Sequence, residues 1–263
     1  KKDILCSCIY GIDIDIHAVE VAKFSLLIKL IEDETAPSVS EVVPILPDLG
    51  DNIQFGNSLV SQTELNGISG ANRQMMEIAP FDWSTINNGC GFDVIIGNPP
   101  YVNTEGMHAL LPSAEVEIYK KKYKTSHKQF DKYFIFIEQA INKINENGLV
   151  CYIVPNKFFK IGAGEKLRNL IAKERMLVSL DDFGDAQLFE DKTIYSSIIL
   201  LSKAKQTSFV YSSVDSANKL WAGEEVSSIE LNSSVLNKLP WRLATDFEFL
   251  TMLQRLDEVS VPL

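Results

Sequence analysis

A short apolar run that ends in two consecutive prolines constrains the fold of this 263-residue chain more than any other segment. Residues 92–97 (FDVIIG) are typical of one buried β-strand, and Asn98, Pro99, Pro100 and Tyr101 follow directly. Proline donates no hydrogen bond to a sheet, its φ is nearly fixed, and the residue before it avoids the helical region. The sequence therefore predicts a strand that ends abruptly in a stiff turn over residues 98–101.

This turn offers a side-chain amide, backbone carbonyls and an aromatic ring at the carboxyl end of a strand. Ligands of open α/β sheets bind at that end of the strands. A stiff polar turn beside a flat ring suits a planar substrate that bears an amino group. A purely structural reading also stays open, because Asn-Pro commonly begins turns that have no function.

The segments around this turn alternate between strand-like and helix-like patterns. We expect strands over 7–13, 53–56, 92–97, 149–154, 176–180, 196–202 and 208–211. We expect helices over 16–31, 130–144, 165–172 and 246–256, the first of them capped by Asp15. Strands separated by helices indicate a mainly parallel sheet, and the late run of strands indicates an antiparallel edge. The predicted fold class is therefore α/β.

The composition is that of a packed protein outside the membrane. Hydrophobic residues make up 46% of the chain, which suffices for a large core. We find no uninterrupted apolar run of about 18 residues and no signal-peptide cleavage site, so we expect a cytoplasmic protein without a membrane span. The four cysteines are best read as reduced and buried, and they and the three histidines form no ligand cluster, so no metal site is predicted.

The formal net charge of −10 argues against a chain that binds nucleic acid over its whole surface. Basic residues are nevertheless concentrated in one segment, which contains Lys121, Lys122, Lys124 and Lys128. This segment is either a solvated loop or helix face, or an edge that contacts phosphates beside an active site.

Five segments of the sequence form an ordered set: 9–15 with the helix that follows, 56–59 (GNSL), 92–101, 134–158, and 182–189 with the strand beyond. Together they resemble the amino-methyltransferases that act on adenine in DNA. The resemblance is greatest to the type IIG restriction-modification enzymes and their relatives in phage defence. The resemblance implies a Rossmann-like sheet that serves an S-adenosylmethionine-dependent methyltransferase.

For the cofactor, the resemblance implies that Asp13 accepts hydrogen bonds from the ribose hydroxyls of S-adenosylmethionine and that Ile14 packs on its adenine. Asn57 and Ser58 stand where the family reads the amino group of that adenine. Family members often carry Asp at the first of these positions, and Asn57 keeps an acceptor oxygen without the charge. Asp13 is alternatively an acid near a helix start, although Asp15 suits that role better.

For the methyl transfer, the resemblance implies that the Asn98 side-chain oxygen and the Pro99 carbonyl accept the two hydrogens of adenine's amine. These acceptors would concentrate the nitrogen lone pair toward the methyl donor and stabilise the positive charge that develops. The base must leave the duplex, and Tyr101 and Phe189 are the expected stacking rings. Phe189 is alternatively a core residue, in which case Tyr195 is the next candidate.

The glycine-rich cofactor loop of this family has no match in the sequence. We therefore predict a longer parent protein in which that loop and the first sheet strand precede Gly11. The predicted domains are an incomplete methyltransferase domain over 1–212, and a linker with the start of a target-recognition region over 213–263. Alone, this chain is expected to bind S-adenosylmethionine weakly or not at all.

The predicted partners are double-stranded DNA with a flipped adenine and the rest of the parent polypeptide, and Mg²⁺ is expected only if the parent carries a nuclease. Three other functions stay open. A protein glutamine methyltransferase or a ribosomal-RNA guanine methyltransferase can use the same turn, because its target nitrogen poses the same lone-pair problem. A non-catalytic DNA-binding fragment can keep the turn as structure alone.

Overall fold

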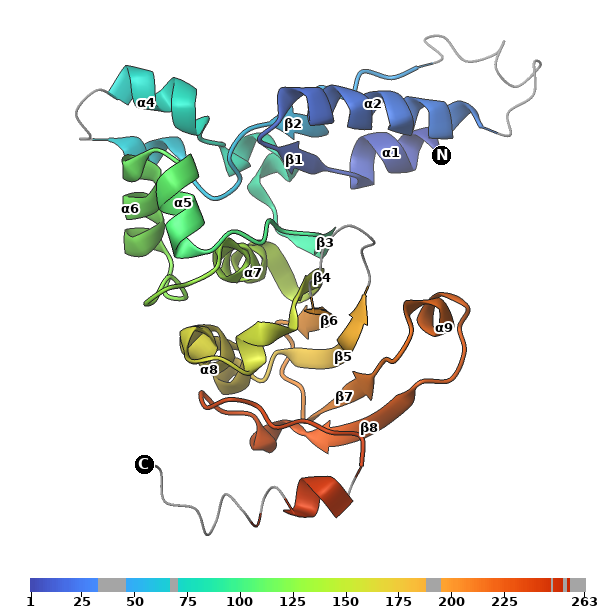
Figure 1. The fold of residues 1–263 in the computed structure, drawn as a ribbon. Helices are drawn as coiled ribbons and strands as arrows, with labels where there is room; N and C mark the ends of the chain where they lie inside the picture. The colour runs from blue at the N-terminus through green and yellow to red at the C-terminus, as the bar shows by residue number, and fades with distance from the viewer. Residues whose placement is uncertain (33–45, 67–70, 188–194, 247, 253–254, 256–263) are drawn as a thin grey trace. The chain divides into compact units, whose positions relative to one another are not determined.

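The computed structural model describes residues 1–32, 46–66, 71–187, 195–246, 248–252 and 255 (Figure 1). The chain divides into two units, one formed by residues 1–90 and 112–119 and the other by residues 91–111 and 120–263. Among the described residues, no helix has the length and apolar character needed to cross a membrane.

The first unit contains a small parallel sheet covered by helices. Its strands β1 (Gly11–Asp13) and β2 (Ile53–Phe55) pair in parallel, with Asp13 opposite Phe55. Its helices are α1 (Lys2–Cys8), α2 (Ile16–Ile31), α4 (Ala71–Ile78) and the part of α6 (Ser113–Lys122) up to Tyr119. Short 3₁₀ turns lie at Gln62–Leu65, Trp83–Thr85 and Asn87–Gly89. The core consists of Leu5, Val19, Leu30, Leu49 and Ile53.

The beginning of this unit confirms one prediction and corrects another. Helix α2 has the predicted bounds, and the Asp15 side chain caps it by accepting a hydrogen bond from the His17 amide. The strand predicted over 7–13 is wrong in its first half, because α1 continues to Cys8 and the strand begins only at Gly11. Asn52 explains the difference, since its amide donates 2.9 Å hydrogen bonds to the carbonyls of Cys6 and Ile9 at the end of α1.

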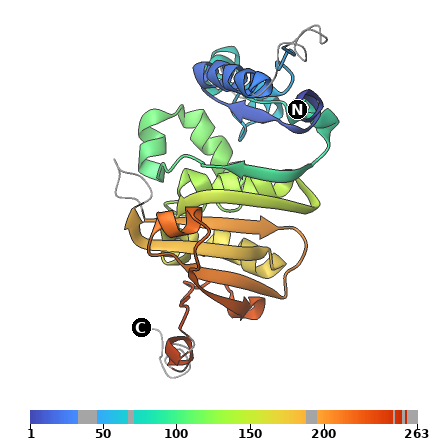
Figure 2. The ribbon, with the colours of Figure 1, turned by 90° about the vertical axis from the view of Figure 1, so that its right-hand side faces the viewer.

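The second unit contains a six-stranded sheet in the order β3-β4-β6-β5-β7-β8 (Figure 2). The strands are β3 (Phe92–Gly97), β4 (Ile144–Pro155), β5 (Leu177–Gln187), β6 (Tyr195–Ser202), β7 (Ser208–Ser213) and β8 (Ser227–Asn232). β3, β4, β5 and β7 run in one direction, and β6 and β8 run against them. The predicted α/β class, a mostly parallel sheet with an antiparallel edge, is confirmed, and β6 adds an antiparallel strand inside the sheet.

Helices connect the strands of this sheet. They are α5 (Thr104–Leu110), the end of α6, α7 (Lys132–Lys143), α8 (Glu165–Glu174) and α9 (Ala217–Trp221), with 3₁₀ turns at Asn156–Phe159, Gly162–Gly164 and Ser233–Val235. Figure 1 shows α7 and α8 on the same side of the sheet. The sequence did not predict α9 or β8, and β8 continues the sheet beyond residue 212 by pairing with β7. The domain boundary at 212 stays a prediction.

Arg168 of α8 anchors the segment that follows β4. Its side chain is buried, and Nη1 donates 2.6 Å hydrogen bonds to the carbonyls of Phe158 and Ile161, while Nε donates to the Lys238 carbonyl at 3.0 Å. Only glycine fits at Gly164, because a Cβ there would lie 1.9 Å from the Phe158 carbonyl oxygen. The backbone after β4 is thus fixed by one guanidinium.

We predict that Arg168→Met lowers the free energy of unfolding by about 2–4 kcal/mol, because three carbonyls lose their donor while the apolar stem is kept. Chemical denaturation monitored by circular dichroism measures this change. Lys166→Met, at an exposed position of the same helix, is the matched control and should leave stability nearly unchanged. Equal stability of the two variants would contradict the anchoring role.

Candidate active site

The proline turn lies where the sequence predicts it, directly after β3 in the second unit. Asn98 is exposed, Pro99 is buried, and Tyr101 is half-buried. The Tyr101 hydroxyl lies 2.5 Å from Asn98 Oδ1 and 3.0 Å from the carbonyl oxygen of Ile153 in β4. The single hydroxyl proton is shared between these acceptors, and the amide oxygen of Asn98 keeps a second lone pair. The turn is therefore tied to the neighbouring strand through a side chain of its own.

A second tyrosine fixes the ring of the first. The rings of Tyr101 and Tyr133 meet edge to face, with centroids 6.2 Å apart and planes at 82°. The Tyr133 hydroxyl donates to the Pro155 carbonyl at 3.3 Å. Burial raises the pKa of Tyr101 to about 12. Burial is also the main cause of the raised pKa of Tyr133, with smaller contributions from the charges of Asp131 and Tyr101. Both phenols are therefore hydrogen-bond donors at neutral pH.

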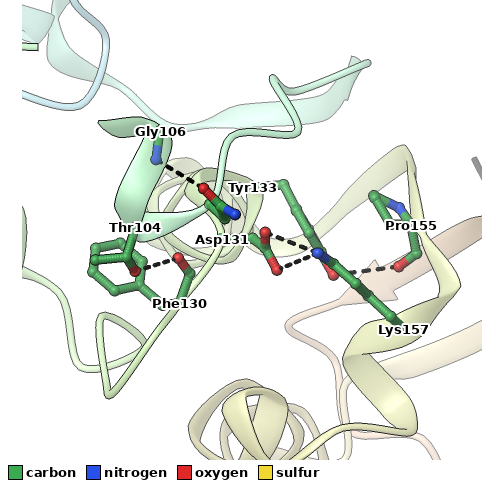
Figure 3. Close-up of polar contacts among 8 residues, drawn as sticks. Thr104, Gly106, Phe130, Asp131, Tyr133, Pro155 and Lys157 are labelled. Carbon is green, nitrogen blue, oxygen red and sulfur yellow. Dashed lines mark hydrogen bonds and ion pairs between the residues drawn. The ribbon is translucent and has the colours of Figure 1, made fainter. Parts of the chain in front are cut away.

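An ion pair between buried Asp131 and exposed Lys157 lies beside the residues that follow the turn (Figure 3). Lys157 Nζ lies 3.0 Å from each carboxylate oxygen of Asp131. The pair lies on the wall of a cavity of about 330 Å³, lined by Asn103, Thr104, Glu105, Gln129, Asp131, Lys157, Ile161 and Ala163. Sequence reasoning missed both charged residues, because Asp131 reads as an ordinary helix cap and Lys157 as one more surface lysine.

The predicted cofactor residues belong to the first unit, at the carboxyl ends of β1 and β2. Asp13 is exposed, and its Oδ1 accepts a 2.8 Å hydrogen bond from the Asp15 amide. Ile14 is 49% exposed. The Gly56 amide donates to the Asp13 carbonyl at 2.8 Å, so the segments after the two strands are joined. The Ser58 carbonyl accepts a 3.1 Å hydrogen bond from the Trp83 indole.

Asn57 is buried in a polar cluster that the sequence did not reveal. Its Nδ2 donates to Glu115 Oε1 at 3.0 Å and to the Tyr119 hydroxyl at 3.3 Å, and its Oδ1 accepts from the Leu59 amide at 3.1 Å. The Tyr119 hydroxyl also donates to Glu115 Oε1. Glu115 is buried as well, so this amide meets a carboxylate inside the protein. A contact between Asn57 and the cofactor stays a prediction.

The remaining predicted site residues lie in the second unit or outside the described residues. Lys121, Lys124 and Lys128 are exposed, whereas Lys122 is half-buried with its ammonium 5.3 Å from the Tyr123 ring centroid. Phe189 lies outside the described residues, and its alternative, Tyr195, begins β6 with 47% exposure. In the part of the chain that the structure describes, no three His, Cys, Asp or Glu side chains gather as a metal site.

Comparison with known proteins identifies the family. The model of the Eco57I restriction-modification methylase family matches residues 7–189. This chain belongs to that family. It is 41% identical over 247 residues to the type II restriction enzyme and methyltransferase RM.Eco57I of Escherichia coli, covering 90% of the chain and 24% of that protein. It is 27% identical to the type II methyltransferase M.XhoI of Xanthomonas vasicola, covering 64% of the chain and 33% of that protein. The chain thus spans a third or less of the length of these curated relatives.

Solved structures share the fold at low sequence identity. A nuclease-deletion mutant of the Type ISP restriction-modification enzyme LlaGI, in complex with a DNA substrate mimic, aligns with a TM-score of 0.60. It is 12% identical, and the alignment covers 95% of this chain and 25% of that one. The DrdV–DNA complex aligns with a TM-score of 0.52 at 14% identity, covering 78% of this chain and 21% of that one. This chain therefore shares the fold of one part of each of these two larger chains.

We predict that the stability contributed by Tyr101 depends on alkaline pH. The raised pKa means that its neutral phenol is favoured in the native state, so this stability is complete below about pH 10 and is lost as pH rises through about 12. Wild type should therefore lose stability relative to Tyr101→Phe across this range. Urea unfolding of both proteins at several pH values measures the difference, and a constant difference would contradict the burial of the hydroxyl.

We also predict that Asn57→Asp is destabilising, by about 2–4 kcal/mol at pH 7, because it places a second carboxylate beside buried Glu115. Adding Glu115→Gln should restore part of the stability, whereas adding Glu117→Gln, at an exposed position of the same helix, should restore none. Denaturant titration of these variants checks the prediction, and equal rescue by both glutamines would refute it.

Proposed function

We propose that this chain supplies the catalytic residues of a DNA adenine methyltransferase in a restriction-modification or phage-defence enzyme. The reaction is transfer of the methyl group of S-adenosylmethionine to the exocyclic amine of an adenine flipped out of double-stranded DNA. The observation that carries the proposal is the turn over residues 98–101, with Asn98 exposed after β3 and its oxygen oriented by the Tyr101 hydroxyl.

Methyl transfer to adenine requires hydrogen-bond acceptors for the two hydrogens of its exocyclic amine. The lone pair of an aromatic amine is delocalised into its ring, so the nitrogen is a weak nucleophile. Asn98 Oδ1 keeps a lone pair for one hydrogen, and the Pro99 carbonyl is the proposed acceptor for the other. Two fixed acceptors favour a pyramidal nitrogen and stabilise the charge that develops on it. Neither group needs to titrate, which agrees with a turn that contains no carboxylate, imidazole or amine side chain.

Aromatic stacking would hold the flipped base. Removing a base from the duplex requires a few kcal/mol, and stacking returns about 1–3 kcal/mol for each base. Tyr101 is the proposed platform, because its hydroxyl bond to β4 and its contact with Tyr133 fix the ring plane. Phe189, or otherwise Tyr195, is the proposed second ring.

The cofactor would contact residues after the first two strands. S-adenosylmethionine supplies an electrophilic methyl group on a sulfonium. The exposed carboxylate of Asp13 has acceptor capacity beyond its bond to Asp15, and the exposed side chain of Ile14 suits packing on an adenine ring. Asn57 and Ser58 complete the proposed cofactor set, with the rest of the parent polypeptide supplying the glycine-rich loop and target recognition.

The lysines at 121, 122, 124 and 128 are the proposed contacts to the DNA backbone. We place the protein in the cytoplasm, where its DNA substrate would be. Mg²⁺ would be required only if the parent protein carries a nuclease.

We predict that full-length protein transfers a tritiated methyl group to DNA and that Asn98→Ala lowers the single-turnover rate by about 100-fold or more. Sequencing of methylated bases identifies N6-methyladenine as the product. Asn142→Ala, an exposed asparagine of α7, is the control and should leave the rate unchanged. Label in release factor or ribosomal RNA instead of DNA would support the other amino-methyltransferases. Full activity of Asn98→Ala would make the turn purely structural.

A further inference from the structure

The Asp131 carboxylate forms an ion pair with Lys157 and does not cap the helix that Asp131 begins. It occupies the N-cap of α7, where an Asp side chain commonly accepts a hydrogen bond from an amide of the first turn. Asp131 makes no such bond. Both carboxylate oxygens instead meet Lys157 Nζ at 3.0 Å, and the Asp131 side chain is 5% exposed against 46% for Lys157. The carboxylate therefore joins the start of α7 to the 3₁₀ turn that follows β4 and does not cap the helix.

The backbone around Asp131 holds the end of the proline turn. The Lys132 amide donates to the Val102 carbonyl at 2.7 Å, and Asn103 forms a β-bridge with Asp131. The Thr104 hydroxyl donates to the Phe130 carbonyl at 2.7 Å (Figure 3). Residues 102–104 are thus attached to 130–132, and the attachment begins one residue after Tyr101.

Lys157, the cation of the pair, lies close in the sequence to the carbonyls that accept hydrogen bonds from Tyr101 and Tyr133. Lys157 follows Pro155 by two residues, and the Pro155 carbonyl accepts the Tyr133 hydroxyl. Ile153 of the same strand accepts the Tyr101 hydroxyl. The turn is therefore attached to the start of α7 through residues 102–104, and to β4 through the Tyr101 hydroxyl. The ion pair joins the start of α7 to the 3₁₀ turn directly after β4.

We propose that the Asp131–Lys157 pair is a positioning device for the Asn98–Tyr101 turn. The inference rests on the proposed function, because it assigns the pair to that reaction. The pair touches no proposed reacting atom and acts by keeping residues 102–104 in place. Displacement of a reacting group by about 1 Å lowers a rate by about 100-fold, so a relaxed turn is expected to slow chemistry and to leave substrate binding intact.

The test compares Asp131→Asn, Lys157→Met and the double variant in the full-length protein. Asp131→Asn is the principal variant, because it leaves no unpaired buried charge, whereas Lys157→Met leaves Asp131 without its cation. Lys160→Met is the matched control. Lys160 lies three residues further along, with its ammonium 3.8 Å from buried Asp182, and no bond joins it to residues 102–104.

We expect Asp131→Asn to lower the single-turnover methylation rate by about 10–100-fold with unchanged dissociation constants for DNA and S-adenosylmethionine. The double variant should be no slower than the slower single variant, since both substitutions break one contact. Lys160→Met should keep the wild-type rate. Fluorescence of 2-aminopurine at the target position should report normal base flipping in every variant.

Several results would overturn the inference. A rate that falls only in proportion to the folded fraction would make the pair merely structural. Weaker DNA binding with a smaller salt dependence in Lys157→Met would make the lysine a phosphate contact. Equal losses in Lys160→Met, or additive losses in the double variant, would also count against it. Wild-type protein that transfers no methyl group to adenine would instead refute the proposed function.

Discussion

The hydrogen bond from the Tyr101 hydroxyl to the Ile153 carbonyl is the contact on which the candidate site depends. Two prolines make the turn stiff, but stiffness alone does not set its orientation against the sheet. The hydroxyl fixes that orientation, because it joins the turn to the adjacent parallel strand and also meets Asn98 Oδ1. One side chain thus determines where the amide oxygen lies and how the ring plane is directed.

Both units use buried carboxylates to orient neighbouring groups. Asp131 holds Lys157 in the second unit, and Glu115 accepts the amide of Asn57 in the first. A buried ion pair or carboxylate adds little net stability, because removing charge from water offsets much of the attraction. Its geometric effect is larger, since a broken contact leaves an unsatisfied buried group. Such contacts therefore favour one arrangement of the residues around them more than they strengthen the fold.

Local chemistry explains which features the sequence predicted. The bounds of α2 follow from apolar periodicity and the Asp15 cap, and the turn over 98–101 follows from covalent restrictions on proline. Both depend on residues that are adjacent in the chain. The partners of Asp131 and Asn57 lie 26 and 58 residues away, so no local pattern reveals them. The helical end of α1 was missed for the same reason, because Asn52 satisfies its carbonyls from a distant segment.

The position of Asn57 shows how such distant contacts change the meaning of a motif. From the local sequence alone, Asn57 is predicted only as a cofactor contact that has an acceptor oxygen and no charge. Read with its neighbours, the amide is the group that can donate to Glu115 and Tyr119 while its oxygen accepts the Leu59 amide. An aspartate would supply no donor and would face another carboxylate. Asparagine at position 57 thus suits the buried acid on α6, because its amide supplies the donor that Glu115 accepts.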